Sequence, residues 1–467
     1  MSKIIVSGMV LKTLASKSGI HPMATFPKSL LLKLSVAAMT FIIPAAALAS
    51  AFQILEQSPA HLGRAFAGTA SNITDASAVF FNPAGMGQLD ERQVTVGANL
   101  ILVQSTFNDQ GSNTGGIEDE TDEPGAVPNL YVVQPINDRW TFGFGLNAPF
   151  GLESSYDRNW MGRYLATDSQ LELVNLNATF AFKLTEQLFL GFGLNYQRAD
   201  VTLESQVDST LGINPNPATD SSALVEGDDD ALAADVSLFF HPIDSTSVGL
   251  VWRQGGDFSL EGNATFALNN ACSPGLGFPT GAPPAPTTGT LCAATLNART
   301  GNIAADVELP DTLTLSVSQM LNDRWSLHGD IAWTGWSSID SIIIVNSDNG
   351  TTVDTLGLMY DDTMRYALGA SYNNAGPWTW RAGVAIDQAP QTSPALVSPR
   401  IPDEDRTWLS AGFNYAMSNA VSIDFGYAHL MVDDAEILND HPQTGHRVAG
   451  NFKADVDIVG IQANWDF

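Results

Sequence analysis

The chain has 467 residues, of which 44% are hydrophobic and 15% charged, and its formal net charge is −29. This length suits two or three soluble domains or one large barrel. Acidic residues outnumber basic ones by 50 to 21, which excludes nucleic acid as a partner because phosphate binding needs a basic surface. From residue 50 onward no run approaches the ~18–20 apolar residues of a membrane-spanning helix.

The N-terminus has the three parts of a cleavable leader. Lys28 and Lys33 supply positive charge, an apolar stretch follows, and Ala47-Leu48-Ala49 is a small-x-small cleavage site. Residues 1–49 are therefore expected to be a signal peptide. This leader is long, and Met23 is an alternative start that would give it an ordinary length.

The segment that follows, residues 50–91, has the period of neither a strand nor one continuous helix. It is low in charge, rich in small residues and interrupted by Pro59, Gly63, Gly68, Pro83, Gly85 and Gly87. Such a segment can fold into short pieces that fill a cavity built by the rest of the chain. We expect a plug (hatch) here, with an ordinary soluble linker as the alternative.

Four short motifs occur in this segment, directly behind the leader. They are Phe52-Gln53, Leu62-Gly63-Arg64-Ala65-Phe66-Ala67-Gly68, Asp75-Ala76 and Asn82-Pro83-Ala84. In this order they resemble the plug of the FadL-type family, which comprises outer-membrane transporters of long-chain fatty acids and other hydrophobic compounds. The resemblance implies an outer apolar groove, a deeper pocket and a sideways exit for the cargo.

Residues 92–467 alternate amphipathic segments with connections that are short and long in turn. The fourteen segments are Gln93–Thr106, Ala126–Gln134, Arg139–Leu152, Gln170–Leu184, Leu188–Glu204, Ala231–His241, Ser247–Phe266, Asn302–Leu321, Trp325–Val345, Met364–Tyr372, Trp378–Asp387, Thr407–Met417, Val421–Ile437 and Asn451–Phe467. An even strand number with this alternation is the plan of an outer-membrane barrel. We therefore expect an all-β fold, a 14-stranded antiparallel transmembrane β-barrel with the plug in its lumen and both termini in the periplasm.

The faces of these segments fit a barrel wall. Along residues 140–147 and 421–427, large apolar side chains alternate with small or polar ones. Aromatic residues beside the short turns fit an interfacial girdle: Trp140, Trp325, Trp378 and Tyr372. In a soluble sandwich the small and charged residues would instead crowd the outer face.

The last segment indicates the compartment. Val459, Ile461, Ala463 and Trp465 alternate with smaller or polar residues, and the chain ends on Phe467. This resembles the terminal signature read by the bacterial barrel-insertion machinery. With the leader, it predicts a monomer in a Gram-negative outer membrane, with that machinery, outer-membrane lipid and lipopolysaccharide as partners.

The third segment contains a candidate exit. Pro149 cannot donate to the strand ladder and Gly151 has no side chain, so pairing is expected to break there. The alternative is a strand that simply ends at Asn147. The family resemblance implies that cargo leaves sideways at this kink, which Phe150 also lines, and that Asn82-Pro83-Ala84 faces it.

The resemblance also implies that Phe52 lies beside the deep pocket, where ligand can displace it. A role as a core residue of the plug is equally open.

A fatty acid also carries a carboxylate, which is costly to bury without a partner. The parity of lumen-facing positions nominates Arg253, Arg381 and Arg406 as anchors. Each could instead pair with a lumen acid, for which the candidates are Asp235, Asp330 and Asp424.

The two cysteines, Cys272 and Cys292, lie in one Pro/Gly-rich stretch of an exported chain. This favours a loop disulfide over a metal site. No His/Cys cluster has zinc spacing and no G-x-S-x-G elbow occurs. We therefore expect no metal, no cofactor and no enzymatic activity.

Together these observations predict a passive channel for long-chain fatty acids or similar hydrophobic molecules, with lateral release at the third strand. One alternative keeps the fold and imports aromatic hydrocarbons or alkanes. More remote alternatives are a surface barrel for adhesion and a lipid hydrolase.

Overall fold

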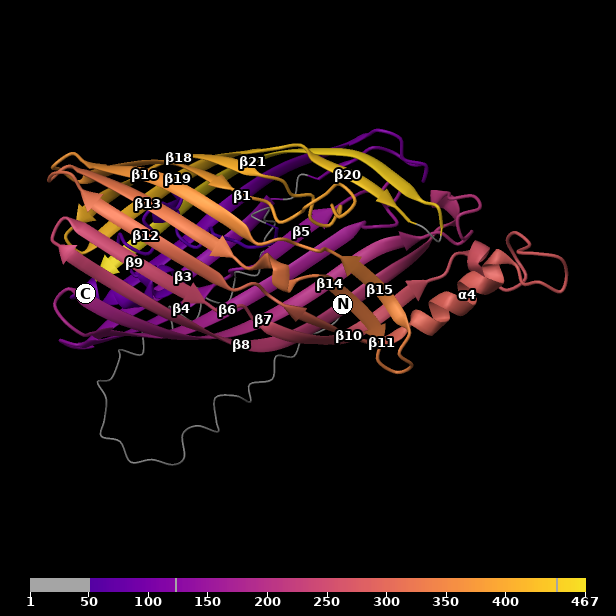
Figure 1. Ribbon diagram of the computed structural model, residues 1–467, viewed down its shortest axis with the longest axis horizontal. Helices are drawn as coiled ribbons and strands as arrows, with labels where there is room; N and C mark the ends of the chain where they lie inside the picture. The colour runs from indigo at the N-terminus through magenta and orange to yellow at the C-terminus, as the bar shows by residue number, and fades with distance from the viewer. Residues whose placement is uncertain (1–50, 122–123, 442–443) are drawn as a thin grey trace, which may run out of the picture. The chain divides into compact units, whose positions relative to one another are not determined.

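The computed structural model describes residues 51–121, 124–441 and 444–467 (Figure 1). The expected signal peptide, residues 1–49, lies outside the described residues, as does Ser50 at the start of the expected plug. In the described part of the chain no helix is long and apolar enough to span a membrane.

The strands form one antiparallel sheet that closes on itself, because its first segment pairs with its last from Gln93↔Asp466 to Asp109↔Gly450. The closed 14-stranded barrel predicted from the sequence is confirmed, although several of its strands consist of two segments. The segments are β1 (Gln93–Asp109), β2 (Glu120–Thr121), β3 (Pro124–Asn137), β4 (Trp140–Asn147), β5 (Gly151–Ser155), β6 (Asp168–Lys183), β7 (Leu188–Val207), β8 (Ser221–Ile243), β9 (Thr246–Arg253), β10 (Asp257–Ala267), β11 (Gly301–Glu308), β12 (Thr312–Met320), β13 (Trp325–Thr334), β14 (Ser341–Asn346), β15 (Thr352–Gly357), β16 (Thr363–Asn373), β17 (Trp378–Asp387), β18 (Arg406–Ser418), β19 (Val421–Val432), β20 (Ala435–Asp440) and β21 (Arg447–Asp466).

The outer wall of the barrel is apolar, and the short turns and the C-terminus lie at one end, opposite the long loops (Figure 1). Exposed side chains of the wall include Leu100, Phe144, Leu250, Leu315 and Ile461. Rings beside the short turns contact one another in cross-strand pairs, with centroid distances of 4.7 Å for Trp140 and Phe182 and 4.7 Å for Trp325 and Tyr372. This arrangement fits an aromatic girdle at one membrane interface.

Two long connections contain more regular structure than the sequence predicts. The β8 strand begins at Ser221, so residues 221–230 are strand and not part of a loop over 205–230. The exposed positions at the end of this stretch are acidic instead of apolar: Glu226, Asp228 and Asp230. Arg198 on β7 forms ion pairs with Asp228 at 2.7 Å and with Asp230 at 3.2 Å. A search for apolar alternation misses such a strand. Similarly, the loop over 267–301 contains the helix α4 (Thr288–Arg299).

One predicted strand is interrupted. The segment expected over 325–345 ends as β13 at Thr334, and a 3-10 turn, η4 (Trp336–Ser338), precedes β14. Trp336 is fully buried in this turn, so it faces the lumen and not lipid.

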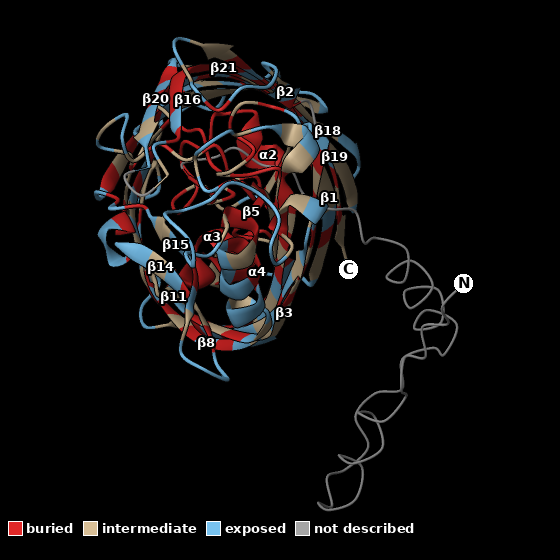
Figure 2. Ribbon diagram, turned by 90° about the vertical axis from the view of Figure 1, so that its right-hand side faces the viewer, coloured by how far each residue is buried: buried red, intermediate tan, exposed pale blue. Residues whose placement is uncertain are grey.

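Residues 51–89 fold inside the ring of strands as short helices, α2 (Pro59–Leu62), α3 (Ala78–Phe81) and the 3-10 helix η1 (Pro83–Gln88) (Figure 2). The backbone nitrogens of Gly68 and Thr69 donate to the Asp330 carboxylate at 2.6 and 3.1 Å. The Ser71 hydroxyl lies 2.9 Å from that of Ser316. This plug is therefore fastened to the wall by polar contacts from several strands.

The plug also approaches the wall at glycines. A Cβ added to Gly249 of β9 would lie 2.0 Å from the carbonyl oxygen of Ala70 in the plug, which no side chain could accommodate without movement. Gly249 lies between the lipid-facing residues Val248 and Leu250. Its lack of a side chain is thus what lets plug and wall meet.

We expect Gly249→Val to weaken plug docking by about 1–3 kcal/mol, the usual range for overpacking a tight contact. The folded barrel should show higher ion conductance in planar bilayers and faster protease cleavage within residues 51–89. The matched control is Gly329→Val, because a Cβ there meets only Leu368 Cδ2, at 3.5 Å, and the wall backbone. If Gly249→Val matches the parent in both measurements, the contact does not hold the plug.

Candidate functional site

An apolar cavity of about 110 Å³ lies inside the barrel above the plug, and we call it the apolar pocket. Phe52 of the plug forms part of its wall and is 4% exposed. The other walls come from the barrel and include Leu152, Leu173, Val201, Phe258, Leu260, Ile303, Val307, Ile342 and Leu358. The structure thus places Phe52 in the wall of the apolar pocket.

The charged residue of the apolar pocket is Arg400, in the connection between β17 and β18. It is 4% exposed, and the hydrogen bonds of its side chain all use Nη1, which donates to Ser169 Oγ at 2.8 Å and to the carbonyls of Asp168 and Glu204. Among the described residues no carboxylate lies within 4.0 Å of its guanidinium. Nη2 and Nε make no hydrogen bond with the described residues, and Arg400 is not among the arginines that the sequence nominates. In the sequence, the one feature that marks Arg400 is its position in a loop next to Pro399.

Two of the three arginines nominated from the sequence form ion pairs with acids of the barrel chain. Arg381 forms an ion pair with Asp424 at 2.5 Å, and Arg406 pairs with Asp403. Arg253 donates to the Phe80 carbonyl of the plug and lies outside the apolar pocket. For Arg381 and Arg406 this is the structural pairing considered as the alternative to ligand binding.

The third barrel strand is broken as its sequence indicates. Both halves pair with β6, at Asn147↔Asn175 and Gly151↔Glu172, so residues 148–150 face only two residues of β6. On the other side β3 pairs with β4 only as far as Leu130. Within the described residues, β5 has no pairing to β3. The wall therefore lacks a ladder between β3 and β5.

The start of the plug covers this break. Ile54 N donates to Pro149 O at 2.8 Å, Gly151 N donates to Phe52 O at 3.0 Å, and Gln57 Nε2 donates to Ala148 O at 2.7 Å. These bonds give the displaced strand partners that β3 does not provide. Residues 52–57 thus form a strap over the break.

The expected position of Asn82-Pro83-Ala84 beside the break is wrong. Asn82 Nδ2 donates to Ala70 O at 2.6 Å and Leu238 O at 3.2 Å, and Ala84 N donates to Ser237 Oγ at 2.9 Å. Asn82 also caps η1, since its Oδ1 accepts from Ala84 N. The motif turns the plug chain against β8. Its polar groups form hydrogen bonds with β8 and with the plug itself.

Three rings separate the apolar pocket from the space beside the break. Phe52 packs edge-on against Trp336 at 4.9 Å between centroids and lies 6.0 Å from Phe150. Phe52 lines the apolar pocket, whereas Phe150 lines a second cavity. We call these three residues the aromatic partition.

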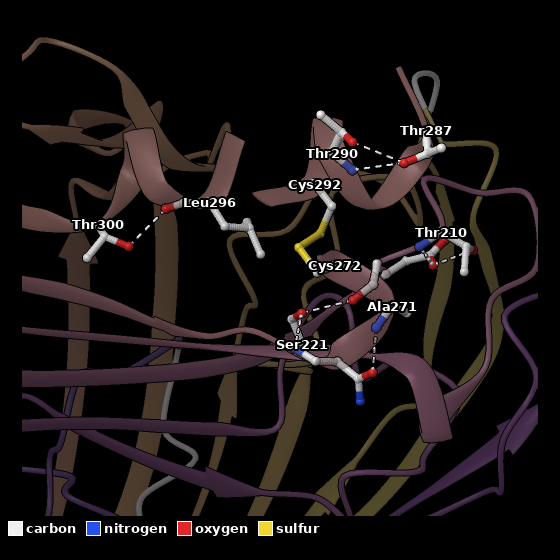
Figure 3. Close-up of a disulfide and its surroundings, with 12 residues drawn as sticks. Thr210, Ser221, Ala271, Cys272, Thr287, Thr290, Cys292, Leu296 and Thr300 are labelled. Atoms are coloured by element: carbon white, nitrogen blue, oxygen red, sulfur yellow. Dashed lines mark hydrogen bonds between the residues drawn. A yellow bond between two sulfur atoms is a disulfide. The ribbon is translucent and has the colours of Figure 1, made fainter. Parts of the chain in front are cut away.

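Toward the long loops the apolar pocket adjoins a larger cavity of about 600 Å³, the outer vestibule, with which it shares Leu203, Val225 and Arg400. A disulfide between Cys272 and Cys292 fastens α4 at this vestibule, and Leu296 of the same helix lines it (Figure 3). This is the pairing expected from the sequence.

Other loops are joined around the vestibule by charged contacts. Arg163 pairs with Asp220 at 2.7 Å, both fully buried, and His446 Nε2 lies 3.0 Å from Asp208 Oδ2. Burial alone would raise the pKa of Asp208, but hydrogen bonds from His446, Thr210 and Gly212 outweigh it and lower that pKa below its usual value. The mouth is therefore a fixed structure and not a set of loose loops.

If the disulfide forms in the exported protein, the non-reduced protein in denaturant should react with no thiol reagent. After reduction it should react at two sites per chain. Mass spectrometry of labelled protein measures both states. Labelling at two sites before reduction would show that α4 is not fastened in this way.

A closed, plugged barrel with an apolar wall and an apolar internal pocket defines an outer-membrane channel for hydrophobic molecules. The profile of the family "Outer membrane protein transport protein (OMPP1/FadL/TodX)" matches residues 40–467. The chain belongs to this family, as its plug motifs predicted. Its family is one of transport proteins and not of enzymes, and the protein is an outer-membrane protein.

The chain is also similar to individual proteins over nearly their full length. The chain is 31% identical to outer membrane protein P1 of Haemophilus influenzae over 449 residues, covering 90% of this chain and 95% of that protein. It is 27% identical to the long-chain fatty acid transport protein of Escherichia coli K12 over 442 residues, covering 89% and 95%.

Among solved structures, a Pseudomonas aeruginosa FadL homologue matches with a TM-score of 0.78 at 25% identity, covering 89% of this chain and all of that one. The Pseudomonas putida toluene transporter TodX matches with a TM-score of 0.66 at 19% identity, covering 89% and 99%. At 19% identity, the similarity to TodX shows only that the two proteins share a fold.

Proposed function

We propose that the cargo is a long-chain fatty acid, which moves passively down its gradient and leaves sideways through the break in the third strand. The observation that carries the choice of cargo is Arg400. It is a buried guanidinium at a largely apolar pocket, with two nitrogens that make no hydrogen bond and no carboxylate within 4.0 Å among the described residues. The name of the Escherichia coli relative agrees with this choice.

The chemistry of the pocket matches both ends of such a ligand. A carboxylate at Arg400 would gain a charge-assisted hydrogen bond that the protein itself leaves unmade. The acyl chain would lie against aliphatic and aromatic walls, where each buried methylene is worth about 0.8 kcal/mol. An aromatic hydrocarbon or an alkane would use the walls but leave Arg400 without a partner, so we rank those cargoes second.

A long acyl chain does not fit without movement. A cavity of about 110 Å³ holds on the order of ten water-sized groups, fewer than the methylenes of such a chain. The chain must therefore displace Phe52, which closes the pocket toward the break. Displacing Phe52 moves the strap, and the strap supplies the hydrogen bonds that cover the break.

Sideways release is favoured by solvation. Release into periplasmic water would re-expose the chain at a cost of about 0.8 kcal/mol for each methylene. Release between β3 and β5 delivers the chain into the bilayer with that burial kept. No single contact in the lumen is large enough to offset this difference for a long chain.

Replacement of Arg400 tests the cargo. Arg400→Met should weaken oleate binding by roughly ten- to a hundredfold, the loss of a charge-assisted hydrogen bond of ~1.5–3 kcal/mol. Binding of dodecane should be unchanged because it has no charge. Titration of the purified barrel with each ligand gives both affinities.

The matched control is Arg198→Met, which removes the same charge from the exposed ion pairs with Asp228 and Asp230. It should leave both affinities unchanged. Normal oleate binding by Arg400→Met would mean that the carboxylate is bound elsewhere or that the cargo is not an acid.

Deletion of Pro149 tests the exit. Residues 148–150 face two residues of β6, so removing one restores equal numbers and should straighten the strand. We expect a folded, heat-resistant barrel that still binds oleate, whereas uptake of labelled oleate by cells should fall at least about tenfold. Deletion of Gly281, in the exposed outer loop, is the control. Uptake at the parental rate after Pro149 deletion would place release elsewhere.

A further inference from the structure

Behind the aromatic partition lies a second cavity, of about 80 Å³, which we call the inner chamber. The plug contributes Gln53, Ile54, Phe80 and Phe81 to its lining, and the broken strand contributes Pro149 and Phe150. Unlike the apolar pocket, it has a polar side formed by the barrel, with Gln197, Arg253, Thr312, Thr314, Asp330, Thr363, Arg365 and Asp387. Any cargo that passes the partition toward the break enters this chamber.

Unlike Arg365, the Arg253 guanidinium of the chamber forms no ion pair within 4.0 Å among the described residues. Its guanidinium lies 4.0 Å from the centroid of the Phe80 ring, and Nη2 donates to the Phe80 carbonyl. Its Nε is buried and makes no hydrogen bond with the described residues. Among the described residues no carboxylate lies within 4.0 Å of its guanidinium, although Asp235, its register partner on β8, attracts it from farther away.

The other charged groups of the chamber have partners. Asp330 accepts hydrogen bonds from Gly68 N, from Thr69 and from Ser316 Oγ, the last at 2.5 Å. Arg365 donates to Ala65 O at 2.7 Å, and its Nε lies 4.0 Å from Asp387. These groups hold the plug and one another, so Arg253 remains for a ligand.

We propose that Arg253 is a second anchor for the carboxylate of the cargo, and that it receives this group after it leaves Arg400. The inference rests on the proposed function, since it requires an acidic amphiphile. In the inner chamber Arg365 is already paired with Asp387, so without Arg253 a carboxylate that crossed the partition would be buried with no unpaired cation, which is strongly disfavoured. Arg253 removes that barrier beside the break, while the acyl chain enters the bilayer between β3 and β5.

Because the two arginines have different proposed roles, replacing each one is expected to cause a different transport defect. Arg400 lines the apolar pocket and sets equilibrium affinity, whereas Arg253 lines only the inner chamber and sets the rate of transfer. The test uses the full barrel reconstituted in lipid vesicles, with transfer of oleate and of uncharged oleyl alcohol measured side by side. These ligands have the same chain and differ in the headgroup.

We expect Arg253→Met to slow oleate transfer at least about tenfold while leaving oleate affinity and oleyl alcohol transfer at parental values. Arg253→Lys keeps the charge and should transfer oleate at close to the parental rate. Because Arg253 also touches the plug at Phe80, a structural defect would slow both ligands in Arg253→Met. Oleyl alcohol is therefore the internal control for plug damage.

Two results would overturn the inference: oleate transfer at the parental rate in Arg253→Met, or an equal loss for oleate and oleyl alcohol. If either occurs while Arg400→Met still loses oleate affinity, the proposed function stands and only the second anchor fails. If the parent protein does not bind oleate better than Arg400→Met does, the proposed function fails and the second anchor fails with it.

Discussion

Every backbone donor and acceptor of a chain in hydrocarbon needs a partner within the protein, and this constraint organises the whole barrel. Pairing of β1 with β21 closes the wall and leaves no free edge there. The third strand departs from this rule, because β5 pairs with β6 but not with β3. Residues 52–57 provide the hydrogen bonds that the wall lacks at this point. A segment of the plug therefore completes the wall at the proposed exit.

The need for a partner within the protein also applies to the charged side chains buried in the lumen. Arg381 and Arg406 have acids beside them, so burial of these charges is compensated within the protein. Arg400 and Arg253 form no ion pair within 4.0 Å among the described residues, where the acids that act on them lie farther away, and each lines a cavity. A buried cation without a counter-charge is costly, and a ligand with a carboxylate would relieve that cost. This difference between the arginines is the basis of the ligand-binding roles proposed for Arg400 and Arg253.

The three cavities differ in chemistry along the inferred path. The outer vestibule is polar and framed by loops that a disulfide and buried ion pairs hold in place. The apolar pocket offers almost only hydrocarbon, and the inner chamber again has a polar side. Rings of Phe52, Phe150 and Trp336 divide the last two. Such a partition prevents an open aqueous pore while leaving a barrier that one segment can remove.

The sequence by itself determined the strands, the closed barrel and the break at Pro149, because these depend on local rules: period-two alternation, turn spacing and a missing backbone donor. It could not locate the first half of β8, in which acidic residues follow the short apolar run Ala223-Leu224-Val225 and interrupt the apolar alternation. Only the tertiary structure decided that residues 52–57, and not Asn82-Pro83-Ala84, cover the break. It also decided which arginines are paired, since a buried charge acquires its partner from strands and loops distant in the chain, and no local pattern records which of them meet across the lumen.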